Sequence, residues 1–173
     1  MIIGLSTSAF TTIHVVITLI AIVTSFIVMF GMIGNKRLPG WTAICLLFTV
    51  LTSATGFMFP IHGFTPAIGT GVISCLLLIV ALIALYAKHL AGAWRRLYVV
   101  TAVAAFWFNV FVLIVQSFEK VPFLNAAAPM VGPPFADPVN THFIVAQGVA
   151  LVVFVAVGVL AAIKFRPGVP LPA

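Results

Sequence analysis

Five long apolar segments alternate with short polar or proline-containing segments along the chain. An α-helix needs about 20 predominantly apolar residues to cross the hydrocarbon core of a membrane, and each segment is close to that length. The segments span residues 10–33, 41–59, 66–87, 97–118 and 141–163. The pattern predicts an all-α integral membrane protein, a five-helix bundle whose single transmembrane domain covers residues 1–173.

The composition agrees with a lipid environment. Hydrophobic residues make up 64% of the chain and charged residues only 6%, whereas an ordinary soluble domain carries about 25% charged residues. The formal net charge is +6, but the basic residues form short clusters between apolar segments and are not interleaved with aromatic residues. This distribution argues against a nucleic-acid partner. It favours a multi-pass protein of the cell inner (plasma) membrane, with membrane lipids as immediate partners.

The distribution of basic residues among the loops predicts the orientation. An odd number of spans places seven of the eight on one side: Lys36, Arg37, Lys88, Arg95, Arg96, Lys164 and Arg166. The other side has Lys120 and both acids, Glu119 and Asp137. By the positive-inside rule we expect the N-terminus outside and the C-terminus in the cytoplasm. No basic residue precedes the first apolar segment, so we expect a permanent span and not a cleaved signal peptide.

The outer segment 119–140 is longer than most connections between helices. It contains five prolines, and its large apolar side chains include Phe123, Leu124, Met130 and Phe135. Because these side chains would otherwise lie in water, we expect the segment to fold over the outer helix ends as a lid. The alternative is an extended tether between distant helix ends.

Three of the four histidines fall on the predicted outer side. His14 lies about one turn inside the first span, His62 lies in the short outer loop, and His142 opens the fifth span. Together with Asp137 they form a possible ligand set for zinc or copper, and two of the imidazoles could ligate haem iron. The spacing matches no metal-binding motif. The alternative is interfacial histidines hydrogen-bonded to loop carbonyls.

Three amides lie within the apolar spans, where hydrocarbon offers no hydrogen-bond partner. Asn109 and Gln116 are seven residues apart and share one stripe of the fourth span, and Gln147 lies in the fifth. With Trp107 they could orient a flat ligand, such as a quinone, porphyrin or sterol, in an apolar pocket. The alternative is hydrogen bonding between helices.

Several absences limit the possible functions. No acidic or basic residue lies in the middle of a span, which argues against an ion-coupled transporter. Glycine-rich phosphate loops and G-x-S-x-G nucleophile motifs are also missing from the sequence. We therefore expect a binding protein and not an enzyme.

Three hypotheses follow from these residues. The first is a protein that binds a lipophilic ligand in an outer pocket, with His14, His62, Trp107, Asn109, Gln116, His142 and Gln147 as contacts. The second is a metal or haem protein with redox or hydrolytic activity, using the outer histidines and Asp137. The third is an accessory or structural subunit of a membrane complex. In each case a homo-oligomer or a larger membrane complex is a possible assembly.

The stretch "LPGWTAICLLFTVLTSATGFMFPIHGFTPAIGTGVISCLLLIVALIALYAKHLAGAWRRLYVVTAVAAFWFNVFVLIVQSF" resembles a group of small bacterial multi-pass membrane proteins. The resemblance implies a bacterial inner membrane, but it transfers no activity and no functional residue. Size and helix count are similar to the translocator-protein (tryptophan-rich sensory) family. The present chain departs from that family's tryptophan-rich pattern, because it has only Trp41, Trp94 and Trp107.

Overall fold

The computed structural model describes residues 1–60, 66–127 and 141–167, and its elements in these ranges are helices. In chain order they are α1 (Thr7–Ile33), α2 (Pro39–Gly56), α3 (Pro66–Leu82), the π-helix η1 (Ile83–Ala87), α4 (Ala93–Lys120), α5 (Pro122–Ala127) and α6 (Thr141–Lys164). Five segments are long and apolar enough to cross a membrane: α1, α2, α3 together with η1, α4 and α6. The prediction of an all-α fold with five candidate spans is therefore confirmed.

Three helices begin earlier than the apolar pattern predicts, namely α1, α2 and α4. The α1 helix starts at Thr7 because the Ser6 hydroxyl accepts a hydrogen bond of 3.2 Å from the Ala9 backbone N–H, as an N-cap residue does. The α4 helix starts at Ala93 and so includes the charged residues Arg95 and Arg96. Hydropathy detects the part of a helix that lies in hydrocarbon, so polar turns at the membrane surface escape it.

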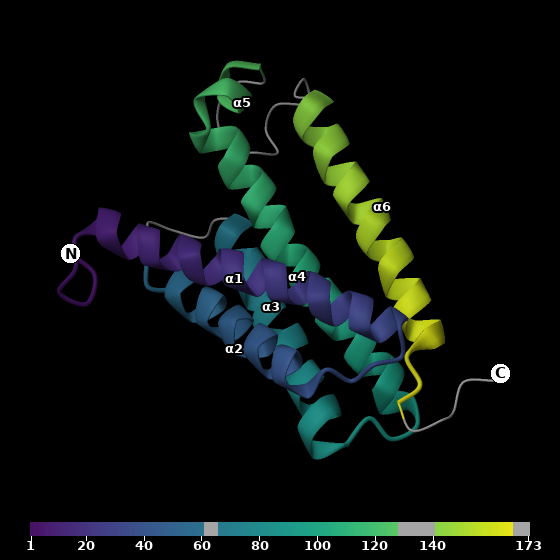
Figure 1. Ribbon diagram of the computed structural model, residues 1–173. Helices are drawn as coiled ribbons and strands as arrows, with labels where there is room; N and C mark the ends of the chain where they lie inside the picture. The colour runs from purple at the N-terminus through teal and green to yellow at the C-terminus, as the bar shows by residue number, and fades with distance from the viewer. Residues whose placement is uncertain (61–65, 128–140, 168–173) are drawn as a thin grey trace.

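The helices form two packed groups that converge at one end (Figure 1). The α1 helix packs along α2, while α4 packs against both α3 and α6. In Figure 1 the C-terminal ends of α1 and α6 approach each other, whereas their N-terminal ends diverge. The bundle is therefore closed at the end that carries the α1–α2 connection and open toward the start of α1.

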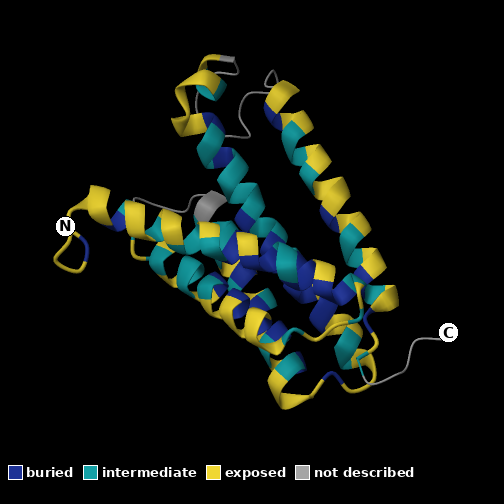
Figure 2. Cartoon of the chain, in the orientation of Figure 1, coloured by how far each residue is buried: buried dark blue, intermediate teal, exposed yellow. Residues whose placement is uncertain are grey.

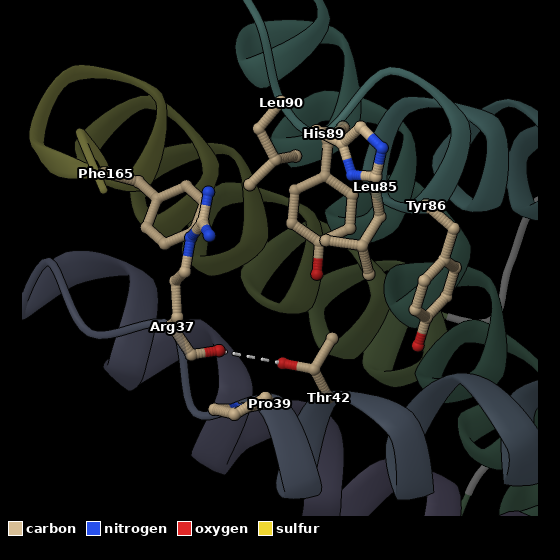
Figure 3. Close-up of a pocket in the computed structure, with 9 residues that line it drawn as sticks. Arg37, Pro39, Thr42, Leu85, Tyr86, His89, Leu90 and Phe165 are labelled. Atoms are coloured by element: carbon tan, nitrogen blue, oxygen red, sulfur yellow. Dashed lines mark hydrogen bonds between the residues drawn. The ribbon is translucent and has the colours of Figure 1, made fainter. Parts of the chain in front are cut away.

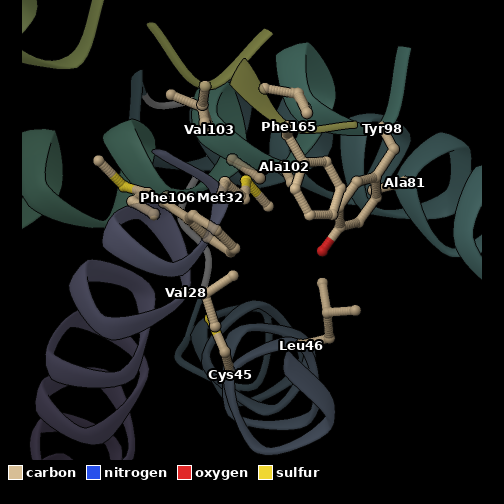
Figure 4. Close-up of a cluster of buried hydrophobic side chains, with 14 of the residues drawn as sticks. Val28, Met32, Cys45, Leu46, Ala81, Tyr98, Ala102, Val103, Phe106 and Phe165 are labelled. Carbon is tan, nitrogen blue, oxygen red and sulfur yellow. The ribbon is translucent and has the colours of Figure 1, made fainter. Parts of the chain in front are cut away.

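The main hydrophobic core lies at the closed end (Figure 4). It combines Val28 and Met32 of α1, Leu46 of α2, and Tyr98 and Phe106 of α4, each at most 2% exposed. Figure 2 shows the buried residues concentrated where these helices meet, while α6 is largely exposed. We call the closed end of the bundle the basic end; it comprises residues 34–38, 88–96 and 164–166. The exposed apolar side chains elsewhere suit contact with lipid.

The opposite end has a smaller core. Val115 and Phe118 of α4 pack with Phe143 of α6, and the Phe118 and Phe143 rings lie 5.7 Å apart in an edge-to-face arrangement. Leu124 of the short helix α5 packs on this cluster, whereas Phe123 is 79% exposed. Residues 128–140, with Met130 and Phe135, lie outside the described residues, so the lid stays a prediction.

Candidate functional site

His14 joins α1 to α2 near the open end of the bundle. Its Nδ1 atom lies 2.7 Å from the Thr55 hydroxyl oxygen, and its ring contacts Phe59 edge-to-face at 5.3 Å. The Thr55 hydroxyl donates to the Leu51 carbonyl at 2.7 Å. A hydroxyl has one proton to donate, so it accepts from His14 Nδ1–H and leaves the lone pair of the imidazole on Nε2. That tautomer suits an interhelical hydrogen bond and also a metal ligand.

The described residues do not bring a second histidine to His14. His142 is exposed at the start of α6, and in Figure 1 that end of α6 is separated from the N-terminal half of α1. His62 and Asp137 lie outside the described residues. Within the described ranges, no three His, Cys, Asp or Glu residues are placed to hold a metal ion. Ligation of zinc, copper or haem therefore stays a prediction.

Gln147 of α6 contacts α4 at Phe111, which lies one helical turn after Trp107. The Gln147 Nε2 atom donates to the Phe111 carbonyl at 3.0 Å, and the Trp107 and Phe111 rings lie 5.5 Å apart. Because a carbonyl only accepts, this bond fixes the amide orientation and directs Oε1 away from it. Both Gln147 Oε1 and Trp107 Nε1 are buried without a hydrogen-bond partner among the described residues. The pair offers one acceptor and one donor.

Asn109 and Gln116 have different surroundings. Asn109 is 6% exposed and follows the fully buried Phe106 on the core face of α4, about 200° around the helix from Trp107. Its Nδ2 atom is also buried without a partner in the described part of the chain. Gln116 lies near the open end, where its Nε2 donates to Glu119 at 3.3 Å. The predicted contacts therefore do not form one site; of the set, Gln147 contacts α4 within one helical turn of Trp107.

The basic end contains a cavity of about 200 Å³ that sequence reasoning missed (Figure 3). Its lining includes Arg37, Thr42, Tyr86, His89 and Tyr98. In the sequence these residues belong to separate segments, and Arg37 was interpreted only as a determinant of orientation. The available signal was the accumulation of basic residues in the loops, and of Tyr86 and Tyr98 at the adjoining helix ends, that an odd number of spans brings to one side.

The fold and these sites define a class: a helical bundle with five candidate transmembrane helices, compatible with a polytopic membrane protein. Comparisons with known protein families, curated proteins and solved structures found no match for this chain. The functional interpretation therefore rests on the chemistry of the residues themselves.

Proposed function

We propose that the protein is a non-catalytic binding protein of the inner membrane that holds a lipophilic molecule between α4 and α6. Trp107 and Gln147 supply its polar contacts. The observation that supports the proposal is the burial of one donor on α4 and one acceptor on α6, both without a partner among the described residues. Gln147 lies six residues after the start of α6, about 9 Å along the helix. With the predicted orientation, this depth is in the outer half of the membrane.

Hydrocarbon cannot form hydrogen bonds with Trp107 Nε1 or Gln147 Oε1. An unpaired polar group in the membrane core costs several kcal/mol, whereas a ligand that pairs with it removes most of that cost. A bound molecule that hydrogen-bonds to both groups would therefore be stabilised in this position relative to bulk lipid. The aromatic rings of Phe108 and Phe111, which contact Trp107 at 4.9 and 5.5 Å, provide an apolar surface beside the polar pair.

The donor and acceptor also narrow the ligand class. Trp107 Nε1–H needs an acceptor and Gln147 Oε1 needs a donor. A hydroxyl group provides both, so a sterol, a reduced quinone or a hydroxyl-bearing lipid fits better than an oxidised quinone, whose carbonyl oxygens only accept. A porphyrin also has donors in its ring and acceptors in its carboxylates. For an iron porphyrin held by two imidazoles, however, the described residues place no second imidazole near His14.

Native mass spectrometry of gently purified protein tests the proposal. We expect the wild type to carry a lipophilic adduct and Trp107→Phe, which removes only the N–H, to bind it about fivefold more weakly. That factor corresponds to one hydrogen bond of about 1 kcal/mol. Gln147→Leu should weaken it similarly. Gln116→Leu is the matched control, because Gln116 donates to Glu119 and not to the ligand.

A wild-type protein without an adduct, or equal retention by Trp107→Phe, Gln147→Leu and the wild type, would contradict the proposal. The first result would favour an accessory subunit in which the polar groups only join helices. Metal analysis of the same sample addresses the other alternative: zinc, copper or haem lost on His14→Ala would favour a metal or haem protein.

A further inference from the structure

The cavity at the basic end is formed by segments that are distant in sequence. Arg37 comes from the α1–α2 connection, His89 from the turn after η1, and Phe165 from the residue after α6. Two contacts hold the residues after α6 against the α1–α2 connection and α4. The Arg166 backbone N–H donates to Asn35 Oδ1 at 2.6 Å, and the Arg95 guanidinium donates to the Phe165 carbonyl. The cavity is thus a built feature of the closed end of the bundle.

Among the described residues, no Asp or Glu belongs to the segments around this cavity. Seven Lys and Arg residues belong to the segments of this end, while both acids of the chain, Glu119 and Asp137, belong to segment 119–140. Arg95 is directed to the carbonyls at the end of α6, where a cation is favourable. Lys88 lies 5.5 Å from the centre of the Trp94 ring. Arg37 and His89 remain exposed at the cavity, and the excess positive field there attracts anions.

The backbone around His89 is unusual. The π-helix η1 ends in a turn in which His89 and Leu90 have φ values of +49° and +62°, a conformation that L-residues rarely adopt. The Leu90 N–H donates to the Ala84 carbonyl at 3.0 Å, and the Leu90 side chain is 7% exposed. Burying Leu90 in this way leaves His89 at the cavity rim (Figure 3). Strained turns and π-helices of this kind concentrate at ligand sites.

The size and position of the cavity indicate a small anionic group attached to a lipid. A volume of about 200 Å³ is below the ~300–1,000 Å³ of sites for drug-sized molecules, so it suits a headgroup and not a whole lipophilic ligand. Tyr86 lines the cavity and is 54% exposed, as an aromatic residue at a membrane–water interface is. Ile83, three residues before Tyr86 in η1, is 41% exposed and offers apolar surface for an acyl chain.

We propose that this cavity binds the phosphate group of an anionic phospholipid from the leaflet at the basic end. Arg37 supplies the positive charge, and the His89 ring N–H and the Tyr86 hydroxyl supply further hydrogen-bond donors. The Thr42 hydroxyl donates to the Arg37 carbonyl at 3.2 Å and so helps to position the Arg37 segment. The chemistry recognised is a phosphate oxyanion, which free inorganic phosphate also carries. The exposed interfacial position of Tyr86 favours the lipid as its source. Basic pockets between helices on the cytoplasmic side commonly have this role.

The test measures lipid retention by the full-length protein in nanodiscs of phosphatidylglycerol and phosphatidylcholine, followed by native mass spectrometry. We expect the wild type to retain phosphatidylglycerol in preference to phosphatidylcholine. Arg37→Gln should reduce the retained phosphatidylglycerol at least about tenfold, the effect of losing one charged hydrogen bond. Arg96→Gln is the matched control, since it removes the same charge from an exposed position outside the cavity.

His89→Asn provides a second variant, because asparagine tolerates positive φ and the turn is retained. It should also reduce retention, and circular dichroism should show unchanged helix content in both variants. Equal losses for Arg37→Gln and Arg96→Gln would overturn the proposal, because they would show a general effect of charge. Displacement of phosphatidylglycerol by millimolar inorganic phosphate would contradict a lipid headgroup as the source of the bound phosphate group. No displacement by phosphate, with loss in Arg37→Gln and His89→Asn only, supports the cavity as a phospholipid site.

Discussion

His14 shows how a single polar side chain is accommodated in an apolar helix. Its Nδ1 atom is 2.7 Å from the Thr55 hydroxyl, and the Phe59 ring covers one side of the imidazole. The sequence indicated that His14 needs a partner at this depth, but it did not identify Thr55, which is 41 positions away. The partner follows from the pairing of α1 with α2, which hydropathy does not specify.

At the residue scale we predict that Thr55→Val destabilises the protein by about 1 kcal/mol, because it leaves a partly buried imidazole nitrogen without its partner. Thr52→Val is the matched control on the same helix, since its hydroxyl donates to the Phe48 carbonyl of α2 at 2.9 Å and, among the described residues, does not join two helices. Equilibrium unfolding in mixed detergent micelles measures both. Equal stabilities of the two variants would show that the His14–Thr55 contact contributes nothing measurable.

At the scale of the helices, the apolar pattern predicted the number of candidate spans and their approximate positions in the chain, and the structure confirms both. Residues 66–87 correspond to α3 together with η1, and residues 141–163 to α6. The pattern did not predict η1 or α5, because neither a π-helix nor a six-residue helix has a hydropathy signature of its own. It also did not predict which helices pair, since lipid-facing and protein-facing residues are equally apolar in a membrane protein.

The close approach of α4 and α6 depends on Gly158. A Cβ atom there would lie 3.3 Å from Val103 Cγ1, and Val103 is only 5% exposed. We predict that Gly158→Leu separates the helices and costs about 1–3 kcal/mol by overpacking. Gly148→Leu, on the same helix with nothing within 4 Å of the added Cβ, should not destabilise. Thermal unfolding of both variants in detergent checks this; equal melting temperatures would refute the close contact.

At the scale of the whole molecule, the helices converge at the basic end and diverge at the other end. This arrangement determines where both proposed sites lie. Sequence reasoning expected one outer site, because it gathered every polar group on that side from topology alone. The structure instead distributes them over separate helix contacts: His14 with Thr55, Gln147 with the Phe111 carbonyl, and Gln116 with Glu119. The cavity at the basic end could not be predicted, because it depends on how three connecting segments pack together.

Both proposals depend on five crossings with the basic end in the cytoplasm. Lys36 and Glu119 are exposed at opposite ends of the described structure, so they suit labelling from either side of the membrane. Single-cysteine variants at these positions, with Cys45 and Cys75 replaced by alanine, would be treated with a membrane-impermeant maleimide in intact cells. We predict labelling of Glu119→Cys in intact cells and of Lys36→Cys only after the membrane is opened. Labelling of both variants from the same side would contradict the five-span topology and the leaflet assigned to each site.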